Sequence, residues 1–278
     1  MYMPNIETII INTIVKIKNN IPNQYGVLID LVKQEIDTLE YQLRALSYNY
    51  IGDRPFNIIN DSTEDILDNY RLVLPNIKPR LIMVFGPSAS GKTSSSSEMI
   101  KMISETNLDF PTCFMTLDGG KFRKASNVFQ MILKHAKEHD IDIVSHNIFP
   151  KVKHTIIKYY ENQITRYNTM ISLYIPITLG KTHVQSYSKY IDMTNDSNWI
   201  GILIWQHKFE CIYEGKYKCN GCAKSGNERE SIEGKKYKLY KWEASMERGL
   251  IEVKKAQGGM YNIHNGGRID STITVLSL

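Results

Sequence analysis

The chain has 278 residues, of which 42% are hydrophobic and 23% are charged. These proportions are ordinary for a globular protein and exclude a largely disordered chain. The net charge of +5 favours anionic ligands, although it is too small to indicate nucleic-acid binding on its own.

The sequence predicts a protein without a membrane span. Its longest apolar runs, at Leu81–Phe85 and Trp199–Trp205, are far shorter than the ~20 residues that cross a bilayer. The first 19 residues lack the basic start and continuous apolar stretch of a secretory signal. Four cysteines in a chain of this length do not form a disulfide scaffold, which indicates a reducing, cytoplasmic location.

Residues 1–78 predict a helical N-terminal region. Isoleucines recur at helical spacing from Ile6 to Ile17, and further helices are expected at Val27–Leu46 and from Ser62 to about Val73. Pro75 and Pro79 then interrupt the pattern, so we place a domain boundary near residue 78.

From residue 79 to residue 278, short apolar segments alternate with helical ones. Strands are expected at Leu81–Phe85, Thr112–Leu117, Ile141–Val144 and Ile171–Ile177, and helices at Lys92–Glu105, Phe122–His139 and Val152–Thr169. This order predicts an α/β domain of three layers with a mainly parallel sheet. A C-terminal β-hairpin is expected from Met260–Ile263 and Ile269–Leu276 around an Asn-Gly turn.

Residues 86–93 match the phosphate-binding P-loop pattern G-x-x-x-x-G-K-[ST] and follow a predicted buried strand. They are Gly86, Pro87, Ser88, Ala89, Ser90, Gly91, Lys92 and Thr93, with Ser94 continuing the loop. Glycines in such loops let the backbone curl so that its N–H groups point at phosphate oxygens. Lys92 is then expected to neutralise the phosphates of ATP, and Thr93 to bind Mg²⁺.

Further polar residues follow the next predicted strands, at the same sheet edge as this loop. Asp118 is expected to accept a proton from the acceptor or to hold Mg²⁺, unless it merely caps the next helix. Lys121 and Arg123 are candidates for binding a substrate phosphate, with a solvated helix face as the other interpretation. His146 and Asn147 are candidates for contacting the acceptor, unless they form a simple turn.

From the loop to about Ile177, the order of elements resembles the zeta-toxin-like branch of the P-loop kinases. That family carries a D-x-D-x-F-[KR] motif after its second strand, where this chain has Asp118-Gly119-Gly120-Lys121-Phe122-Arg123. The resemblance implies transfer of the γ-phosphate of ATP, with Mg²⁺, to a hydroxyl of a sugar nucleotide or related acceptor. The family's catalytic base is the second Asp of the motif. Gly120 stands at that position, so Asp118 is the nearest carboxylate.

A cysteine cluster falls in a basic insert expected at about residues 206–238. Its residues are His207, Cys211, Cys219 and Cys222, with the spacing H-x3-C-x7-C-x2-C. Two residues between cysteines let both thiolates reach one Zn²⁺, so a structural zinc site is one interpretation. A redox-active or inert cysteine pair is the other.

Four basic side chains in the last fifty residues are further candidates for the site. P-loop kinases need mobile cations that offset the charge of the transferred phosphate and exclude water, and Arg229 and Arg248 are the candidates for this lid. A solvated face is the other interpretation. His264 and Arg268 flank the C-terminal Asn-Gly turn and are weaker candidates for a substrate phosphate.

These features predict a P-loop kinase that uses ATP and Mg²⁺ to phosphorylate a hydroxyl group of a small-molecule or sugar-nucleotide acceptor. Two alternatives stay open. Tyrosines interleaved with lysines between residues 213 and 241 suit a kinase that acts on nucleic-acid ends. Gly120, where a base is expected, suits a catalytically degenerate NTP-binding protein that serves as an interaction module.

Overall fold

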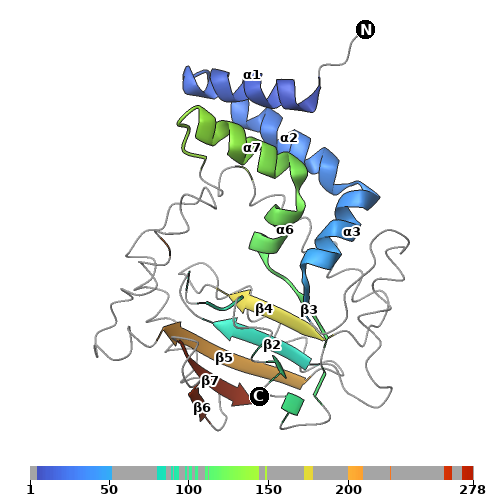
Figure 1. Ribbon diagram of the computed structural model, residues 1–278, viewed down its shortest axis with the longest axis vertical. Helices are drawn as coiled ribbons and strands as arrows, with labels where there is room; N and C mark the ends of the chain where they lie inside the picture. The colour runs from blue at the N-terminus through green and yellow to red at the C-terminus, as the bar shows by residue number, and fades with distance from the viewer. Residues whose placement is uncertain are drawn as a thin grey trace.

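The structure is a computed structural model, and it describes part of the chain. The described residues are 5–51, 80–85, 89, 91–93, 98, 100–101, 104–105, 110–111, 113–143, 148, 172–177, 200–208, 226, 260–264 and 271–277. Within them the chain is mixed α/β, with a layer of helices standing on one sheet (Figure 1). The helix predicted at Ser62–Val73, the one at Val152–Thr169 and the boundary near residue 78 lie outside the described residues.

Five helices have described bounds. They are α1 (Ile6–Lys18), α2 (Gln24–Ile36), α3 (Leu39–Tyr48), α6 (Gly119–Ala125) and α7 (Asn127–Glu138). In Figure 1, α1, α2 and α7 lie side by side at the top, and α3 and α6 descend from them toward the sheet. The apolar sides of α1, α2 and α7 face one another and bury Ile10, Leu28 and Ile132 completely.

Two of the predicted helices are each divided in two by a capping residue. Thr38 separates α2 from α3, and its hydroxyl accepts from the Tyr41 N–H at 3.2 Å. Ser126 separates α6 from α7, and its hydroxyl accepts from the Phe129 N–H at 3.0 Å. Both capping residues have extended backbone angles, which end one helix and let the side chain satisfy the free N–H groups of the next.

The sheet has seven strands among the described residues. They are β1 (Tyr50–Ile51), β2 (Arg80–Phe85), β3 (Phe114–Thr116), β4 (Leu173–Ile177), β5 (Ile200–Lys208), β6 (Met260–His264) and β7 (Ser271–Ser277). Their spatial order is β1-β3-β4-β2-β5-β7-β6. The four central strands are parallel, whereas β1, β6 and β7 pair antiparallel. The sheet is therefore mixed, where a mainly parallel one was expected.

The strand predictions had mixed success. The buried strand before the P-loop and the pairing of β6 with β7 are confirmed. The strand expected at Ile141–Val144 is wrong for residues 141–143, which have no regular structure; there the Ile141 N–H bonds back to the Ala136 carbonyl of α7 at 2.8 Å. β5 was not predicted, although it is longer than any other described strand.

One face of the sheet carries a cluster of buried apolar side chains around β2. Ile82 and Val84 of β2, Phe114 of β3 and Tyr174 of β4 pack there with three further buried residues, Ile51, Ile100 and Phe110. Ile100 belongs to the segment after the P-loop, whose described residues at 98, 100, 101, 104 and 105 are helical as predicted. Ile100 of this segment therefore packs against the sheet next to β2.

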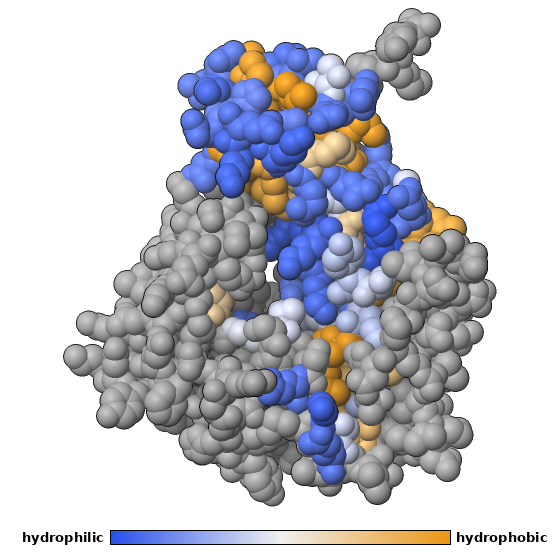
Figure 2. All heavy atoms as spheres, in the orientation of Figure 1, coloured by the Kyte–Doolittle hydropathy of each residue, from blue (hydrophilic) through white to orange (hydrophobic). Residues whose placement is uncertain are grey.

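On the face shown in Figure 2, the helical layer is mostly hydrophilic, with hydrophobic side chains scattered through it. Among the helices described, none combines the length and apolar character that crossing a bilayer requires.

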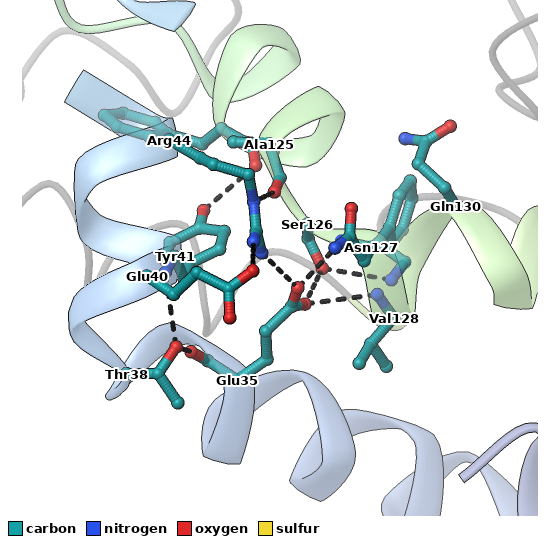
Figure 3. Close-up of polar contacts among 12 residues, drawn as sticks. Glu35, Thr38, Glu40, Tyr41, Arg44, Ala125, Ser126, Asn127, Val128 and Gln130 are labelled. Atoms are coloured by element: carbon teal, nitrogen blue, oxygen red, sulfur yellow. Dashed lines mark hydrogen bonds and ion pairs between the residues drawn. The ribbon is translucent and has the colours of Figure 1, made fainter. Parts of the chain in front are cut away.

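A nearly buried carboxylate, Glu35, joins α2 to α3 and to the start of α7 (Figure 3). Its oxygens accept from the backbone N–H groups of Asn127 at 2.8 Å and Val128 at 3.2 Å, and from the Ser126 hydroxyl. The Arg44 guanidinium lies 2.9 Å from the same carboxylate. Glu35, on α2, thus accepts hydrogen bonds from free N–H groups of α7. Its negative charge also interacts favourably with the positive N-terminal end of the α7 dipole.

We expect Glu35→Ala to lower the free energy of unfolding by roughly 3 kcal/mol, because it leaves N–H groups of α7 without their acceptor and removes the less exposed of the two carboxylates paired with Arg44. Urea denaturation followed by circular dichroism measures this change. Asp30→Ala, which removes an exposed ion pair with Lys33 from the same helix, is the matched control and should change stability by less than about 0.5 kcal/mol. Equal losses in the two variants would contradict the role given to Glu35.

Candidate functional site

The P-loop segment begins where the connections of the sheet diverge. β2 lies between β4 and β5. The next described strand after β2 is β3, on the β4 side of β2, and the next described strand after β5 is β6, which lies on the opposite side, beyond β7. Ligands of open α/β sheets bind at such a point, beyond the carboxyl ends of the strands. Because residue 86 directly follows β2, the loop starts at this position.

The described part of the loop has an unusual backbone. Ala89 has φ 62° and Gly91 has φ 87°, so both lie in the left-handed region. Glycine adopts this conformation freely, whereas alanine does so at a cost of about 1 kcal/mol. Alternation of left- and right-handed residues is the geometry in which successive N–H groups turn toward one side and can bind an anion. Gly86, Pro87, Ser88, Ser90 and Ser94 lie outside the described residues.

Lys92 is held at the end of the loop by a tyrosine from the neighbouring strand. The Tyr174 hydroxyl, on β4, donates to the Lys92 carbonyl oxygen at 2.6 Å. Tyr174 is fully buried and is the register partner of Ile82 on β2. Burial, with a smaller effect of the Asp118 charge, raises the pKa of Tyr174, so its hydroxyl stays protonated and remains a donor.

Tyr174 was not predicted as a site residue. The sequence does contain a signal for it, which is a tyrosine in the middle of an apolar strand. Such a residue is expected to be buried, and a buried Tyr hydroxyl needs a hydrogen-bond partner. The sequence could not show that this partner is the backbone of Lys92, 82 residues earlier in the chain.

Asp118 meets Thr93 directly, although their strands are not neighbours. The Thr93 hydroxyl donates to Asp118 Oδ2 at 3.0 Å. The other oxygen, Oδ1, accepts from the Gly120 N–H at 2.8 Å and caps α6. Asp118 therefore caps the next helix and at the same time contacts a residue of the P-loop pattern, whereas its role toward an acceptor or Mg²⁺ stays a prediction.

Gly120 lies against the Asp118 carboxylate. A Cβ atom at this position would come within 3.3 Å of Asp118 Oδ1. Any side chain there would therefore require the carboxylate to shift by a few tenths of an ångström. Glycine at this position lets Asp118 keep its hydrogen bonds to Thr93 and to the backbone at the same time.

Lys121 adds a second cation near Asp118. Its ammonium lies 3.5 Å from the hydroxyl of Thr116, the last residue of β3, which is fully buried. Burial lowers the pKa of Lys121, the Asp118 charge opposes this effect, and Lys124 adds to it. Arg123, predicted with Lys121, lies half-buried on α6 two residues further along.

The other predicted site residues fall mostly outside the described part. Those outside are Cys211, Cys219, Cys222, Arg229, Arg248, His146, Asn147 and Arg268. His207 on β5 and His264 on β6 are both register partners of Thr272 on β7, so the sheet brings these two residues into one row. Among the described residues, no group of three or more His, Cys, Asp or Glu gathers as a metal site. Zinc binding by the cysteine cluster stays a prediction.

Tyr174→Phe is expected to lower the free energy of unfolding by about 1–3 kcal/mol, because the buried Lys92 carbonyl loses its donor while the ring stays in place. Denaturation by urea measures the loss. The matched control is Tyr48→Phe, in which the exposed hydroxyl of another tyrosine is removed. If both variants were as stable as the wild type, the 2.6 Å contact would have no role in holding the loop.

Lys121→Met is expected to raise the Tm at pH 7, because the wild type must bury a positive charge. Folding lowers the pKa of Lys121 below its ordinary 10.5. At a pH between the lowered pKa and 10.5, the unfolded chain binds more protons than the folded one, so the wild-type stability rises with pH. The advantage of the variant should therefore shrink as the pH approaches 10.5. Thermal unfolding at several pH values tests this, with the exposed Lys137→Met as control. A lower Tm for Lys121→Met at pH 7 would contradict it.

No family model, no curated protein and no solved structure matches the chain. The features of the described residues that bear on function are therefore the loop after β2, Asp118 and Lys121.

Proposed function

We propose that the chain is a kinase with a P-loop NTPase fold, which uses ATP and Mg²⁺ to phosphorylate a hydroxyl acceptor. The observation that carries this proposal is the 3.0 Å contact between Thr93 Oγ1 and Asp118 Oδ2, directly beside Lys92 of the P-loop pattern. In P-loop NTPases, a loop Ser or Thr and an Asp from a second strand hold Mg²⁺. The parallel centre of the sheet supports the same fold.

The oxygens at this point suit Mg²⁺. The Thr93 hydroxyl and the Asp118 carboxylate are hard oxygen donors, which Mg²⁺ prefers, and they already lie within one hydrogen bond of each other. Mg²⁺, when bound with ATP, supplies positive charge that offsets the charge of the phosphates. Asp118 cannot turn away from this position freely, because its second oxygen is held by the Gly120 N–H.

Each cation of the site then has an electrostatic role. Lys92 follows the curled segment of the loop and is assigned to the β- and γ-phosphates. Lys121, whose charge is partly removed from water, is assigned to an anionic group of the acceptor or to the transferred phosphate. Arg229 and Arg248 remain the proposed lid residues, which would exclude water after ATP binds.

Between the two roles weighed for Asp118, the contacts favour holding the metal over accepting the proton. Both carboxylate oxygens already have protein donors, from Thr93 and from Gly120. Phosphoryl transfer passes through a loose transition state, in which positioning and charge stabilisation matter more than proton removal. A kinase of this kind can therefore work without a carboxylate at position 120.

A second candidate function is nucleotide binding without transfer, and Gly120 favours it. The kinases that the sequence resembles have their base at this position, whereas here a Cβ atom would already crowd Asp118. The protein would then bind ATP at the same loop and act through its shape. The two candidates differ in one observable, which is the formation of a phosphorylated acceptor.

The decisive experiment measures transfer from γ-labelled ATP, with Mg²⁺, to UDP-sugars, nucleosides and 5′-hydroxyl oligonucleotides. Lys92→Ala and Thr93→Ala should each lower kcat/KM by about 10²–10³-fold, because each removes a group that stabilises charge in the transition state. Thr93→Ser, which keeps the hydroxyl, is the matched control and should retain most of the activity.

The class of acceptor that becomes labelled identifies the substrate, and a labelled oligonucleotide would favour the nucleic-acid end kinase. Asp118→Asn should raise the Mg²⁺ concentration that gives half-maximal activity. ATP binding without any labelled product would overturn the kinase proposal and favour the nucleotide-binding protein.

A further inference from the structure

The helix that carries Asp118 at its start cannot hold its own position. α6 has seven residues, and helices this short are not stable alone. The last four carbonyl groups of a helix have no partner within it. In α6, three of these four carbonyls accept hydrogen bonds from groups outside the helix: those of Phe122, Arg123 and Ala125.

Two of the three donors come from α3. The Tyr41 hydroxyl donates to the Phe122 carbonyl oxygen at 2.9 Å, and Arg44 Nε donates to the Ala125 carbonyl oxygen at 3.0 Å. Tyr41 is 1% exposed, and its ring fills the space between the two helices. Burial raises the pKa of Tyr41, with a further rise from the Glu35 charge, so the hydroxyl remains a donor.

The residues of α3 are themselves held in place (Figure 3). Arg44 is paired with Glu35 at 2.9 Å and also with Glu40. At the other end of α3, the Asn49 carbonyl accepts from the Thr116 N–H at 2.7 Å. α3 and the residue that follows it therefore contact the chain on both sides of Asp118, two residues before it and four residues after it.

We propose that Tyr41 and Arg44 are positioning residues, which hold Asp118 against Thr93 by fixing α6. The connection runs from Tyr41 to the Phe122 carbonyl, back along two residues of α6 to the Gly120 N–H, and from there to the Asp118 carboxylate. This inference rests on the proposed function, since it assigns to the N-terminal helices control over the Mg²⁺ site.

The test compares Tyr41→Phe with Tyr48→Phe in the full chain. Both variants lose one hydroxyl from α3, but that of Tyr48 is exposed. Tyr41→Phe should raise the Mg²⁺ concentration for half-maximal transfer by about tenfold, the low end of the effect of residues that orient metal ligands. Tyr48→Phe should leave it unchanged. A purely structural role would lower the Tm of Tyr41→Phe without changing the Mg²⁺ dependence.

A double-mutant cycle shows whether Tyr41 acts through Asp118. In the Asp118→Asn background, adding Tyr41→Phe should cause no further change in the Mg²⁺ dependence, because the group that Tyr41 positions has already been altered. Independent, multiplicative effects would overturn the proposal. Arg44→Lys is the second variant, used if Tyr41→Phe does not fold. It keeps a positive charge for Glu35, but one ammonium cannot replace the planar fork that reaches Glu35, Glu40 and the Ala125 carbonyl at once.

Binding of Mn²⁺, measured by electron paramagnetic resonance with ATP present, separates this inference from the proposed function. If the wild type transfers no phosphate but Tyr41→Phe weakens Mn²⁺ binding, the kinase proposal fails and the positioning role stands. If the wild type transfers phosphate while Tyr41→Phe and Tyr48→Phe behave alike, the positioning role fails. A wild type that does not bind Mn²⁺ would overturn both.

Discussion

The candidate site depends on one carboxylate that accepts from two parts of the chain at once. Asp118 takes the Thr93 hydroxyl on one oxygen and the Gly120 N–H on the other. The strands before these residues, β2 and β3, are separated in the sheet by β4. The contact is possible because all three strands are parallel and end at the same edge. β4, which lies between β2 and β3, also supplies Tyr174, whose hydroxyl donates to the Lys92 carbonyl at the end of the loop.

A second shared carboxylate completes the arrangement. Glu35 stabilises the start of α7 in the way that Asp118 stabilises the start of α6, but it does so from a different helix. α6 therefore lies between two fixed points: the P-loop at its first residue, and the pair of α2 and α3 at its last. This short helix connects the helical layer to the sheet. A shift of either one would therefore move Asp118.

Sequence reasoning succeeded where the signal is local. The apolar run of β2 and the position of Asp118 beyond the next strand both derive from short patterns read in order. It failed where the deciding contact is distant. The apolar periodicity of Phe122, Phe129 and Ile132 continues across Ser126, which predicts one helix. The chain nevertheless breaks at Ser126, whose hydroxyl donates to Glu35, 91 residues away. Likewise, the apolar strand around Tyr174 indicates that this residue is buried, but not which backbone group it binds. The residues after α7 have an apolar pattern that suits a strand, yet Ile141 bonds back to that helix.

The packing of α1 and α2 against α7 has a consequence for the order in which the protein folds during synthesis. Glu35 and the backbone N–H that it binds at Asn127 are 92 positions apart. The apolar side chains of α1 and α2 leave the ribosome long before α7, which packs against these helices. Until α7 has been synthesised, side chains such as Ile10, Ile14, Leu28 and Val32 lack part of the surface that buries them and are accessible to chaperones. Closure of the helical layer thus depends on contacts between residues far apart in the sequence, which form more slowly than local ones.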